Sequence, residues 1–276
     1  MKKIILLTGA TGFLGSNILK ELSQRGYYTR VVIRNANASF DSSLLIERII
    51  QTEDLFQETV DWWKKQLEGV EYLIHTAWYV EPGKYLNSDK NYDCLIGTIN
   101  IAKAASLSTN LKRVIGLGTC FEYNLNFGLL SVDTPLDPKT PYSISKVSAY
   151  LILKEIFSTT NILFIWCRLF YLYGEGEKPN RLVTHIVEKI NNNEKVELTS
   201  GMQIRDFLDV KIAAKEIVDK IDLNEVKVVC NICSGIPITV KDFAIKIATE
   251  LNGLNLLQFG ARKDNLIDPP VVLGVK

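Results

Sequence analysis

Short apolar runs alternate with amphipathic helical patterns through most of this 276-residue chain. Strands joined by long helical connections favour parallel pairing, and helices then cover the faces of such a sheet. The predicted strands are Lys3–Leu7, Tyr28–Ile33, Ile46–Gln51, Val70–His75, Arg113–Leu117 and Ile162–Cys167, and the predicted helices between them are Gly12–Gln24, Leu55–Leu67, Asn87–Leu107 and Tyr142–Ser158. The pattern predicts an α/β fold with a doubly wound parallel sheet.

A loop rich in turn-forming residues, Tyr173 to Asn180, marks the predicted boundary between a first domain (1–172) and a smaller second one (173–276). The second domain is expected to mix helices and short strands. Its predicted elements are Arg181–Asn191, Val196–Thr199, Asp206–Leu208, Val210–Ile221, Val226–Ile232 and Val240–Asn252. Part of residues 206–232 is expected to return to the first domain.

Composition excludes several classes of protein. With 32 basic and 31 acidic residues, the chain has no basic excess for binding nucleic acid or an anionic membrane. The apolar run Ile4–Leu7 is too short for a signal peptide, and no stretch fits a transmembrane helix, so we expect a cytoplasmic protein. Five cysteines form no secreted disulfide framework, and Cys230 and Cys233, three apart on a predicted strand, should face opposite sides.

A glycine-rich turn follows the first predicted strand and opens the first predicted helix. The turn runs from Gly9 to Gly15, and its candidate cofactor-binding residues are Gly9, Thr11, Gly12, Phe13, Leu14 and Gly15. Glycines at such a junction permit a tight turn, let the backbone approach a pyrophosphate, and leave that phosphate at the positive end of a helix. The motif therefore indicates dinucleotide binding, and a plain tight connection is the alternative.

Arg34 stands at the end of the second predicted strand, where a dinucleotide-binding fold meets the adenosine ribose. A carboxylate at this place pairs with the ribose hydroxyls of NAD, whereas a guanidinium suits the 2′-phosphate of NADP. We therefore expect NADP(H) to be preferred over NAD(H), unless Arg34 is simply a solvated arginine.

Tyr142 and Lys146 lie one helical turn apart after Pro141, which places the phenol and the ammonium on one helix face. An adjacent cation should lower the pKa of Tyr142 and make the phenol a general acid or base. Thr119 follows the strand Arg113–Leu117, at the sheet edge where α/β proteins keep their sites, and its hydroxyl can meet a substrate oxygen. A merely structural pair and a bland strand-end threonine are the alternatives.

Together these residues resemble the extended short-chain dehydrogenase/reductase family, from Lys3 to about Val275. The shared motifs, in family order, are the glycine turn, His75-Thr76-Ala77, Gly97-Thr98, Thr119, Tyr142 with Lys146, Arg168 with Tyr173-Gly174, and Arg205-Asp206-Phe207. The resemblance implies a Rossmann-type domain, a smaller C-terminal α/β lid that binds a sugar nucleotide, and a homodimer formed through Asn87–Leu107 and the helix of Tyr142.

The resemblance also implies roles for individual residues. Tyr142 would exchange a proton with a sugar carbonyl oxygen while hydride passes to or from the nicotinamide, Lys146 would hold the nicotinamide ribose, and Thr119 would orient the oxygen. The implied cofactor contacts include Tyr142 and Lys146, and further Asp54, Leu55, Ala77 and Trp78. The implied substrate contacts are Thr119, Phe121, Glu122, Tyr171, Arg205 and Arg262, with Glu122 either meeting a sugar hydroxyl or lying exposed at the surface.

The residues after Thr119 decide between reactions. Family members that dehydrate their substrate place an Asp-Glu pair there, and this chain has Cys120-Phe121. Without a second acid or base, the resemblance implies NADPH-dependent reduction of a 4-keto group on a nucleotide-linked 4-keto-6-deoxyhexose. A 4-epimerase with tightly bound NAD and a non-catalytic NADP-sensing protein are the alternatives. His75 and His185 have no partner at metal-ligand spacing, so no metal is expected.

Overall fold

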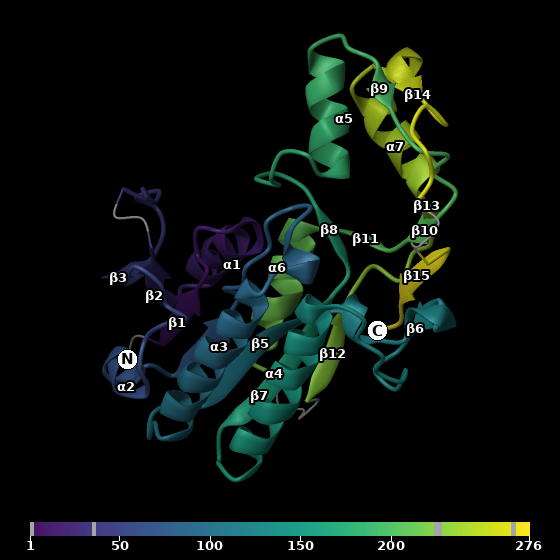
Figure 1. Ribbon diagram of the computed structural model, residues 1–276. Coiled ribbons are helices and arrows are strands. Elements are labelled where there is room, and N and C mark those ends of the chain that lie inside the picture. The colour runs from purple at the N-terminus through teal and green to yellow at the C-terminus, as the bar shows by residue number, and fades with distance from the viewer. Residues whose placement is uncertain (1–2, 35–36, 224–227, 266–268) are drawn as a thin grey trace.

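The computed structural model describes residues 3–34, 37–223, 228–265 and 269–276. Its centre is a parallel sheet of seven strands in the order β12-β7-β5-β4-β1-β2-β3 (Figure 1). These strands are β1 (Ile4–Thr8), β2 (Tyr28–Ile33), β3 (Ile46–Gln51), β4 (Tyr72–His75), β5 (Arg113–Thr119), β7 (Leu163–Leu169) and β12 (Val229–Ile232). The sheet confirms the predicted α/β fold class. Strand order reverses between β1 and β4, which is where open parallel sheets bind ligands.

Helices cover both faces of this sheet because its strands are apolar on both sides. Leu7 of β1 lies in one core cluster, and its neighbour Leu6 lies in the other, as expected for successive strand residues. The first cluster takes residues from α1 (Phe13–Gln24) and α6 (Val210–Asp219). The second takes residues from α2 (Val60–Leu67), α3 (Lys90–Ser106) and α4 (Pro141–Ser158).

A smaller layer of short elements rises beyond the carboxyl edge of the sheet and is called the lid below (Figure 1). Its helices, α5 (Leu182–Asn191) and α7 (Val240–Glu250), share a core that includes Ile186 and Phe243. Around them lie β8 (Tyr171–Tyr173) paired with β11 (Phe207–Asp209), β9 (Val196–Glu197) paired with β14 (Leu257–Gln258), and a sheet of β13 (Ile238–Thr239), β10 (Ile204–Arg205), β15 (Val271–Gly274) and β6 (Leu129–Leu130).

The chain crosses between the two parts more than once. It enters the lid after β7, returns to the large sheet through α6 and β12, and then re-enters the lid at β13. Cys230 lies on β12, and its Sγ lies 3.5 Å from Sγ of Cys167 on the neighbouring strand β7. Cys233 packs instead in a separate cluster with Tyr123 and Val272. The two cysteines thus pack in different clusters, and Cys233 lies beyond β12, which ends at Ile232, so the two are not on one strand as predicted.

Some element boundaries differ from the prediction. Helix α2 begins at Val60 and not at Leu55, because the Thr59 side chain accepts a hydrogen bond from the Trp62 N–H and caps the helix there. Just before it, the carboxylate of Asp54 accepts the N–H of Phe56 and holds a turn. Most lid strands are only two or three residues long, too short to show an alternating pattern in the sequence.

Candidate active site

The glycine turn joins β1 to α1 and brings backbone close to backbone. Gly9 has φ of 73°, a conformation that favours glycine, and a Cβ on Gly15 would lie 2.0 Å from the carbonyl oxygen of Gly9. Gly12 is the N-cap of α1 and offers no side chain to cap the helix. The N–H groups of the first turn, at Phe13 and Leu14, therefore face the space in front of the helix. This arrangement fits a dinucleotide phosphate.

A hydrogen-bonded chain fixes the end of β4 against β1. The Thr8 hydroxyl accepts the N–H groups of Thr76 and Ala77, both at 3.2 Å, so its hydrogen points to Nδ1 of His75 at 2.8 Å. The His75 Nε2–H then donates to the Thr98 hydroxyl at 2.9 Å. Burial lowers the pKa of His75 to about 3, so the ring is neutral. Through Thr8, His75 holds the backbone of Thr76 and Ala77, and Ala77 is one of the residues expected at the nicotinamide.

The residues expected at the adenosine lie along the same edge of the sheet. Arg34 directly follows β2 and is exposed. Asp54 follows β3 and is half-buried, with its carboxylate used by the turn at Phe56. Leu55 is buried in the core cluster that contains Trp63. Arg34 and Asp54 thus remain candidates for side-chain contacts with a cofactor, while Leu55 has little side-chain surface to offer.

Tyr142, Lys146 and Thr119 come together at the carboxyl end of β5. The first turn of α4, capped by Thr140, presents Tyr142, and Thr119 is the last residue of β5. The Thr119 hydroxyl hydrogen-bonds the Tyr142 phenol. Nζ of Lys146 donates to the carbonyl of Leu117 at 2.8 Å. Tyr142, Lys146 and Thr119 are all buried.

Burial sets the protonation of this group. It raises the pKa of Tyr142 well above its usual range, and the hydrogen bond from Thr119 lowers it only in part. The expectation that Lys146 lowers the Tyr142 pKa is wrong for the chain as it stands. Nζ of Lys146 lies 6.0 Å from the phenol ring, and burial lowers the pKa of Lys146 itself to about 7.

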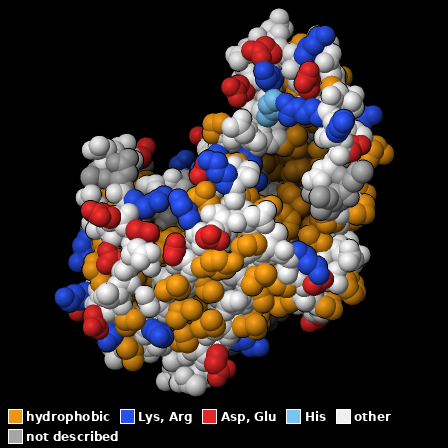
Figure 2. Space-filling model, in the orientation of Figure 1, with side chains coloured by type: hydrophobic (Ala, Val, Ile, Leu, Met, Phe, Trp, Pro, Cys, Tyr) orange, Lys and Arg blue, Asp and Glu red, His pale blue; other side chains and the backbone are white. Residues whose placement is uncertain are grey.

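Aromatic rings surround the reacting groups. Tyr85 meets the Tyr142 ring edge-on with ring centroids 4.8 Å apart, and the Trp78 indole lies 3.7 Å from Nζ of Lys146. On the lid side, Phe121 and Tyr171 contact each other with ring centroids 6.3 Å apart. Figure 2 shows a hollow between the body and the lid that is lined largely by hydrophobic side chains. The sequence analysis missed Tyr85, whose only signal was an aromatic segment soon after His75.

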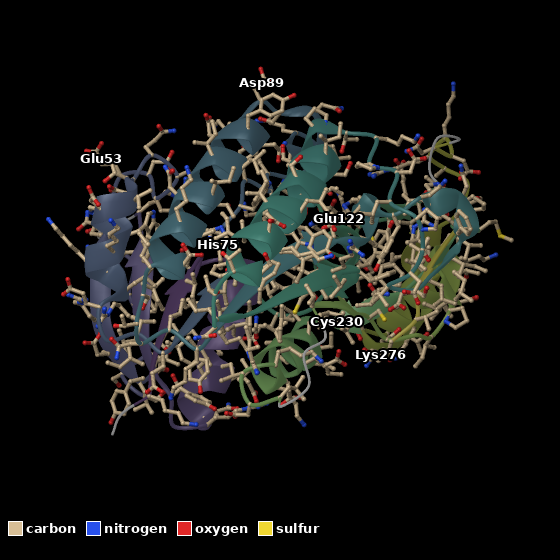
Figure 3. All side chains as sticks on the ribbon, turned by 90° about the horizontal axis from the view of Figure 1, so that it is seen from below. Glu53, His75, Asp89, Glu122, Cys230 and Lys276 are labelled. Carbon is tan, nitrogen blue, oxygen red and sulfur yellow. The ribbon has the colours of Figure 1, made fainter. Side chains whose placement is uncertain are left out.

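Glu122 is not at the surface and does not face a sugar hydroxyl, so both expectations for it are wrong. Its side chain, labelled in Figure 3, is 0% exposed. Its carboxylate pairs with Nε of Arg168 at 2.7 Å. The N–H of Thr119 and the indole N–H of Trp166 also donate to it. The η2 turn (Cys120–Glu122) folds this residue back behind Thr119, a reversal that spacing alone does not reveal.

The two arginines expected at a diphosphate lie at different places in the lid. Arg205, on β10, is buried, and its guanidinium lies 5.5 Å from the Tyr171 ring centroid. It therefore sits beside the aromatic lining of the hollow. Arg262, after β14, is exposed, and its guanidinium lies 3.5 Å from Nε2 of His185 on α5. Arg205 lies against Tyr171, which contacts Phe121 two residues after Thr119. Arg205 is thus connected to the residues around Thr119, whereas Arg262 contacts His185 on α5.

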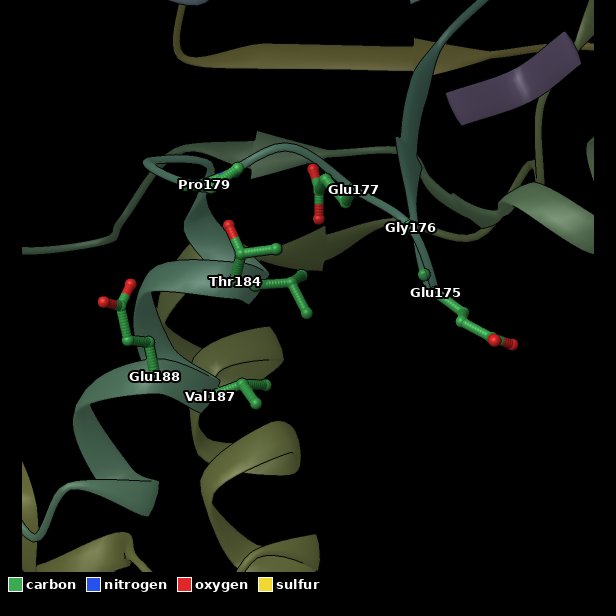
Figure 4. Close-up of a pocket in the computed structure, with 9 residues that line it drawn as sticks. Glu175, Gly176, Glu177, Pro179, Thr184, Val187 and Glu188 are labelled. Atoms are coloured by element: carbon green, nitrogen blue, oxygen red, sulfur yellow. The ribbon is translucent and has the colours of Figure 1, made fainter. Parts of the chain in front are cut away.

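A cavity of about 410 Å³ lies between α5 and the loop that precedes it (Figure 4). The loop contributes Glu177, and α5 contributes Thr184, Val187 and Glu188. Burial raises the pKa of Glu177 to about 7, and nearby Arg181 lowers it in part. One oxygen of this carboxylate is buried without a hydrogen-bond partner. Sequence reasoning did not single out Glu177.

Comparison with known families agrees with this geometry. A model of the NAD dependent epimerase/dehydratase family matches residues 5–230. This chain belongs to that family. Membership makes it an oxidoreductase or isomerase that uses a nicotinamide cofactor, and it confirms the resemblance found in the sequence.

Relatives within the epimerase/dehydratase family span nearly the whole chain. The dTDP-6-deoxy-L-talose 4-dehydrogenase (NAD(+)) of Aggregatibacter actinomycetemcomitans is 25% identical over 255 residues, which cover 90% of this chain and 90% of the relative. The CDP-abequose synthase of Salmonella typhimurium is 25% identical over 284 residues, which cover 97% of this chain and 88% of the relative.

Solved structures of family members share the fold. UDP-glucose 4-epimerase of Thermotoga maritima with UDP-glucose matches with a TM-score of 0.83 at 19% identity, covering 99% of this chain and 89% of that one. MoeE5 in complex with UDP-glucuronic acid and NAD matches with a TM-score of 0.79 at 20% identity, again covering 99% and 89%.

Among the described residues, no group of three or more His, Cys, Asp or Glu side chains could hold a metal ion. None of the helices seen in these residues is long and apolar enough to cross a membrane.

Proposed function

We propose that this chain is an NADPH-dependent reductase of the 4-keto group of a nucleotide-linked 4-keto-6-deoxyhexose. The observation that carries the proposal is that neither of the two ionisable side chains of the η2 turn after Thr119, Cys120 and Glu122, is available as a second acid or base. Cys120 is buried, and burial raises the pKa of its thiol to about 12. The carboxylate of Glu122 already accepts three donors. Dehydration and C3/C5 epimerisation each need a second proton carrier, whereas carbonyl reduction needs one donor.

In this reaction the ketone gains a hydride at carbon and a proton at oxygen. NADPH, held by the glycine turn and Lys146, would supply the hydride. Tyr142 donates the proton, since burial keeps the phenol protonated until alkoxide character develops at the sugar oxygen. Thr119 orients that oxygen through its hydroxyl, and Lys146 binds the ribose next to the nicotinamide ring.

The lining of the hollow supports a deoxy sugar as substrate. Tyr85, Phe121 and Tyr171 offer ring faces and edges to the apolar face and methyl group of a 6-deoxyhexose. Arg205 lies beside Tyr171 and suits a diphosphate. Two relatives carry names of deoxysugar enzymes, dTDP-6-deoxy-L-talose 4-dehydrogenase and CDP-abequose synthase.

A panel of nucleotide ketosugars tests the reaction directly. Mixed with NADPH and CDP- or dTDP-4-keto-6-deoxyglucose, the purified chain should oxidise NADPH, seen as loss of its absorbance. Tyr142→Phe should slow turnover by about 10²–10⁴-fold while leaving NADPH affinity unchanged. Absence of turnover with every ketosugar of the panel would contradict the proposal, and loss of NADPH binding in Tyr142→Phe would leave its assigned role without support.

The cofactor preference rests on Arg34, which is exposed at the end of β2 where a 2′-phosphate would lie. The name of one relative specifies NAD(+), so binding of both cofactors is to be compared. We expect NADPH to bind more tightly than NADH, and Arg34→Ala to weaken NADPH binding by about 10-fold or more with little effect on NADH. Equal affinities that Arg34→Ala leaves unchanged would contradict the preference.

A nucleotide-sugar 4-epimerase is the second candidate. The fold shared with UDP-glucose 4-epimerase favours it, and the Thr119, Tyr142 and Lys146 arrangement would serve it as well. An epimerase retains its cofactor through turnover, so NAD recovered from the purified chain, with interconversion of a sugar nucleotide and no net NADPH consumption, would replace the reductase proposal. A chain that binds NADPH and acts on no sugar nucleotide would instead favour a sensing role.

A further inference from the structure

A carboxylate with no exposure to solvent lies directly behind Thr119. Oε1 of Glu122 accepts the N–H of Thr119 at 2.8 Å and the indole N–H of Trp166 at 3.0 Å. Oε2 accepts Nε of Arg168 at 2.7 Å, and both partners of this ion pair are buried. Burial raises the pKa of this carboxyl, and the ion pair with Arg168 and the two N–H donors oppose the rise. These three donors are what an ionised side chain needs in order to stay charged in the interior.

We propose that Glu122 is a positioning residue, whose carboxylate fixes the Thr119 hydroxyl at the reacting carbonyl and supplies the buried negative charge that Lys146 faces. The proposal rests on the proposed function for the roles of Thr119 and Lys146. Glu122 itself touches neither substrate nor cofactor, so it acts through these two residues.

The first half of the proposal follows from the hydrogen bonds of Thr119. Its backbone N–H is held by Glu122, and its Oγ1 accepts the N–H of Phe121 at 3.3 Å. These contacts close the short η2 turn from both ends in a reciprocal cap. With one lone pair used by the Phe121 N–H, the hydroxyl still has its hydrogen, which it can donate to Tyr142 in the structure as it stands or to a substrate carbonyl oxygen when one is bound.

Gly118 shows that the chain makes room for this carboxylate. A Cβ at Gly118 would lie 2.2 Å from Oε1 of Glu122 and 2.2 Å from Nε1 of Trp166. Its φ is not in the left-handed region, so backbone conformation does not require glycine here. Glycine at this position is therefore explained by the space that Glu122 and Trp166 occupy.

The second half follows from the surroundings of Lys146. Its Nζ lies 5.9 Å from the Trp166 ring, whose N–H donates to Glu122. The titratable and charged groups on elements packed around it include His75, Tyr85, Cys94, Cys120, Glu122, Tyr142 and Arg168. Glu122 raises the pKa of Lys146, with a smaller contribution from Cys94, while burial lowers it to about 7. Arg168 offsets part of this charge, and its guanidinium packs against Tyr123 and Tyr150.

The test compares Glu122→Gln with the unaltered chain. Glutamine has nearly the same shape and still offers an oxygen to the Thr119 N–H, but it removes the charge. NADPH affinity is measured by fluorescence between pH 5 and 10, and the pH dependence of turnover is measured with the ketosugar. Because removal of the carboxylate lowers the pKa of Lys146, the alkaline loss of NADPH affinity should move to lower pH by about one unit or more. Misplacement of Thr119 should lower kcat by about 10–100-fold with little change in KM.

Two further variants make the result interpretable. Glu122→Gln leaves Arg168 without its counter-charge, so the double variant Glu122→Gln/Arg168→Met is measured as well in case the single variant folds poorly. Because Arg168 offsets part of the Glu122 charge, the double variant should show a shift in the same direction that is smaller than that of the single variant. Glu71→Gln removes a carboxylate paired with Lys112 at the amino end of β4, and it should shift nothing.

The outcomes separate this inference from the proposed function. A shifted NADPH-binding profile in a chain that reduces no ketosugar would contradict the proposed reaction and support the role of Glu122 toward Lys146. Normal reduction with unshifted profiles in the folded single or double variant would overturn the inference. If the unaltered chain bound neither NADPH nor NADH, both would fall.

Discussion

At the scale of single residues, burial decides which groups carry charge in the candidate site. His75, Lys146 and Tyr142 lie close together, and burial shifts the pKa of each in the direction that favours the neutral side chain. The pKa falls to about 3 for His75 and to about 7 for Lys146, and it rises for Tyr142. Burial also raises the pKa of Glu122, and Arg168 with the N–H donors of Thr119 and Trp166 opposes that rise. The chain thus places its reacting groups where solvent does not set their protonation.

Lys146 should cost stability at neutral and acid pH. Its pKa is about 7 in the folded chain and 10.5 when unperturbed, so between these values the unfolded chain holds the extra proton and the free energy of unfolding rises with pH. Below pH 7 the charge stays buried and the full penalty applies. Lys146→Met should therefore raise Tm by roughly 3–10 °C at pH 6, and the gain should shrink toward pH 10. Thermal unfolding at pH 6, 8 and 10 measures this.

A lysine on the exposed face of the same helix provides the control. Lys154 lies on α4 and is exposed, so Lys154→Met should show no such pH-dependent gain. An equal change in Tm for Lys146→Met at all three pH values would mean that the ammonium is not destabilised by burial.

At the scale of elements, close backbone approaches set where the site forms. The turn after β1 lets α1 approach so closely that a Cβ on Gly15 would overlap the Gly9 carbonyl. In the same way, a Cβ on Gly97 of α3 would lie 2.4 Å from Cα of Phe56. These contacts hold α1 and α3 close to the turns at the carboxyl edge of the sheet, where the implied cofactor residues lie.

Gly15→Ala should separate α1 from the turn. The added methyl group would lie 2.0 Å from a carbonyl oxygen, so the helix must shift and its first-turn N–H groups must move away from the phosphate position. We expect a loss of about 2–4 kcal/mol in stability and a drop of at least about 10-fold in NADPH affinity. Urea unfolding and fluorescence titration measure the two effects. Lys20→Ala, on the exposed side of α1, should change neither, and a Gly15→Ala chain with normal NADPH affinity would contradict the role of the turn.

At the scale of the whole molecule, one buried carboxylate links the lid to the body. Asp206, between β10 and β11, accepts the N–H and hydroxyl of Ser234, the N–H of Gly235 and the N–H of Gly274. These donors come from the loop after β12 and from the last strand, β15. Arg205, the candidate for diphosphate binding, is its direct neighbour, so this linkage also places the substrate side of the site.

Asp206→Asn should loosen this linkage. The amide would set its own N–H groups against backbone N–H donors and leave at least one of them without a partner. We expect a loss of about 2–4 kcal/mol in the free energy of unfolding, measured in urea. As a control, Asp133→Asn, at an exposed loop position, should change the free energy of unfolding by less than about 0.5 kcal/mol. Equal effects of the two substitutions would show that Asp206 does not carry the linkage.

We also propose that two copies of the chain pair through α3 and α4. Tyr92 and Ile96 of α3 and Ile144 and Leu151 of α4 are exposed, and Figure 2 shows hydrophobic side chains over the face where these helices lie. Ile96→Glu combined with Leu151→Glu should turn a dimer into a monomer in sedimentation equilibrium, because each copy would bury charges in the interface. Ile236→Glu, at an even more exposed isoleucine that lies between β12 and β13, should leave the dimer intact. A monomeric unaltered chain would contradict the pairing.

The sequence by itself determined the sheet, the glycine turn and the position of Thr119, Tyr142 and Lys146 at one edge. It could do so because strand and helix periodicity, and the one-turn spacing of Tyr142 and Lys146, are local properties of the chain. Only the tertiary structure decided what surrounds them. It buried Glu122 against Arg168 and brought Tyr85 to Tyr142. It also raised the pKa of Tyr142, which Lys146 was expected to lower. Burial and solvation depend on residues distant in sequence, and so no local pattern reports them.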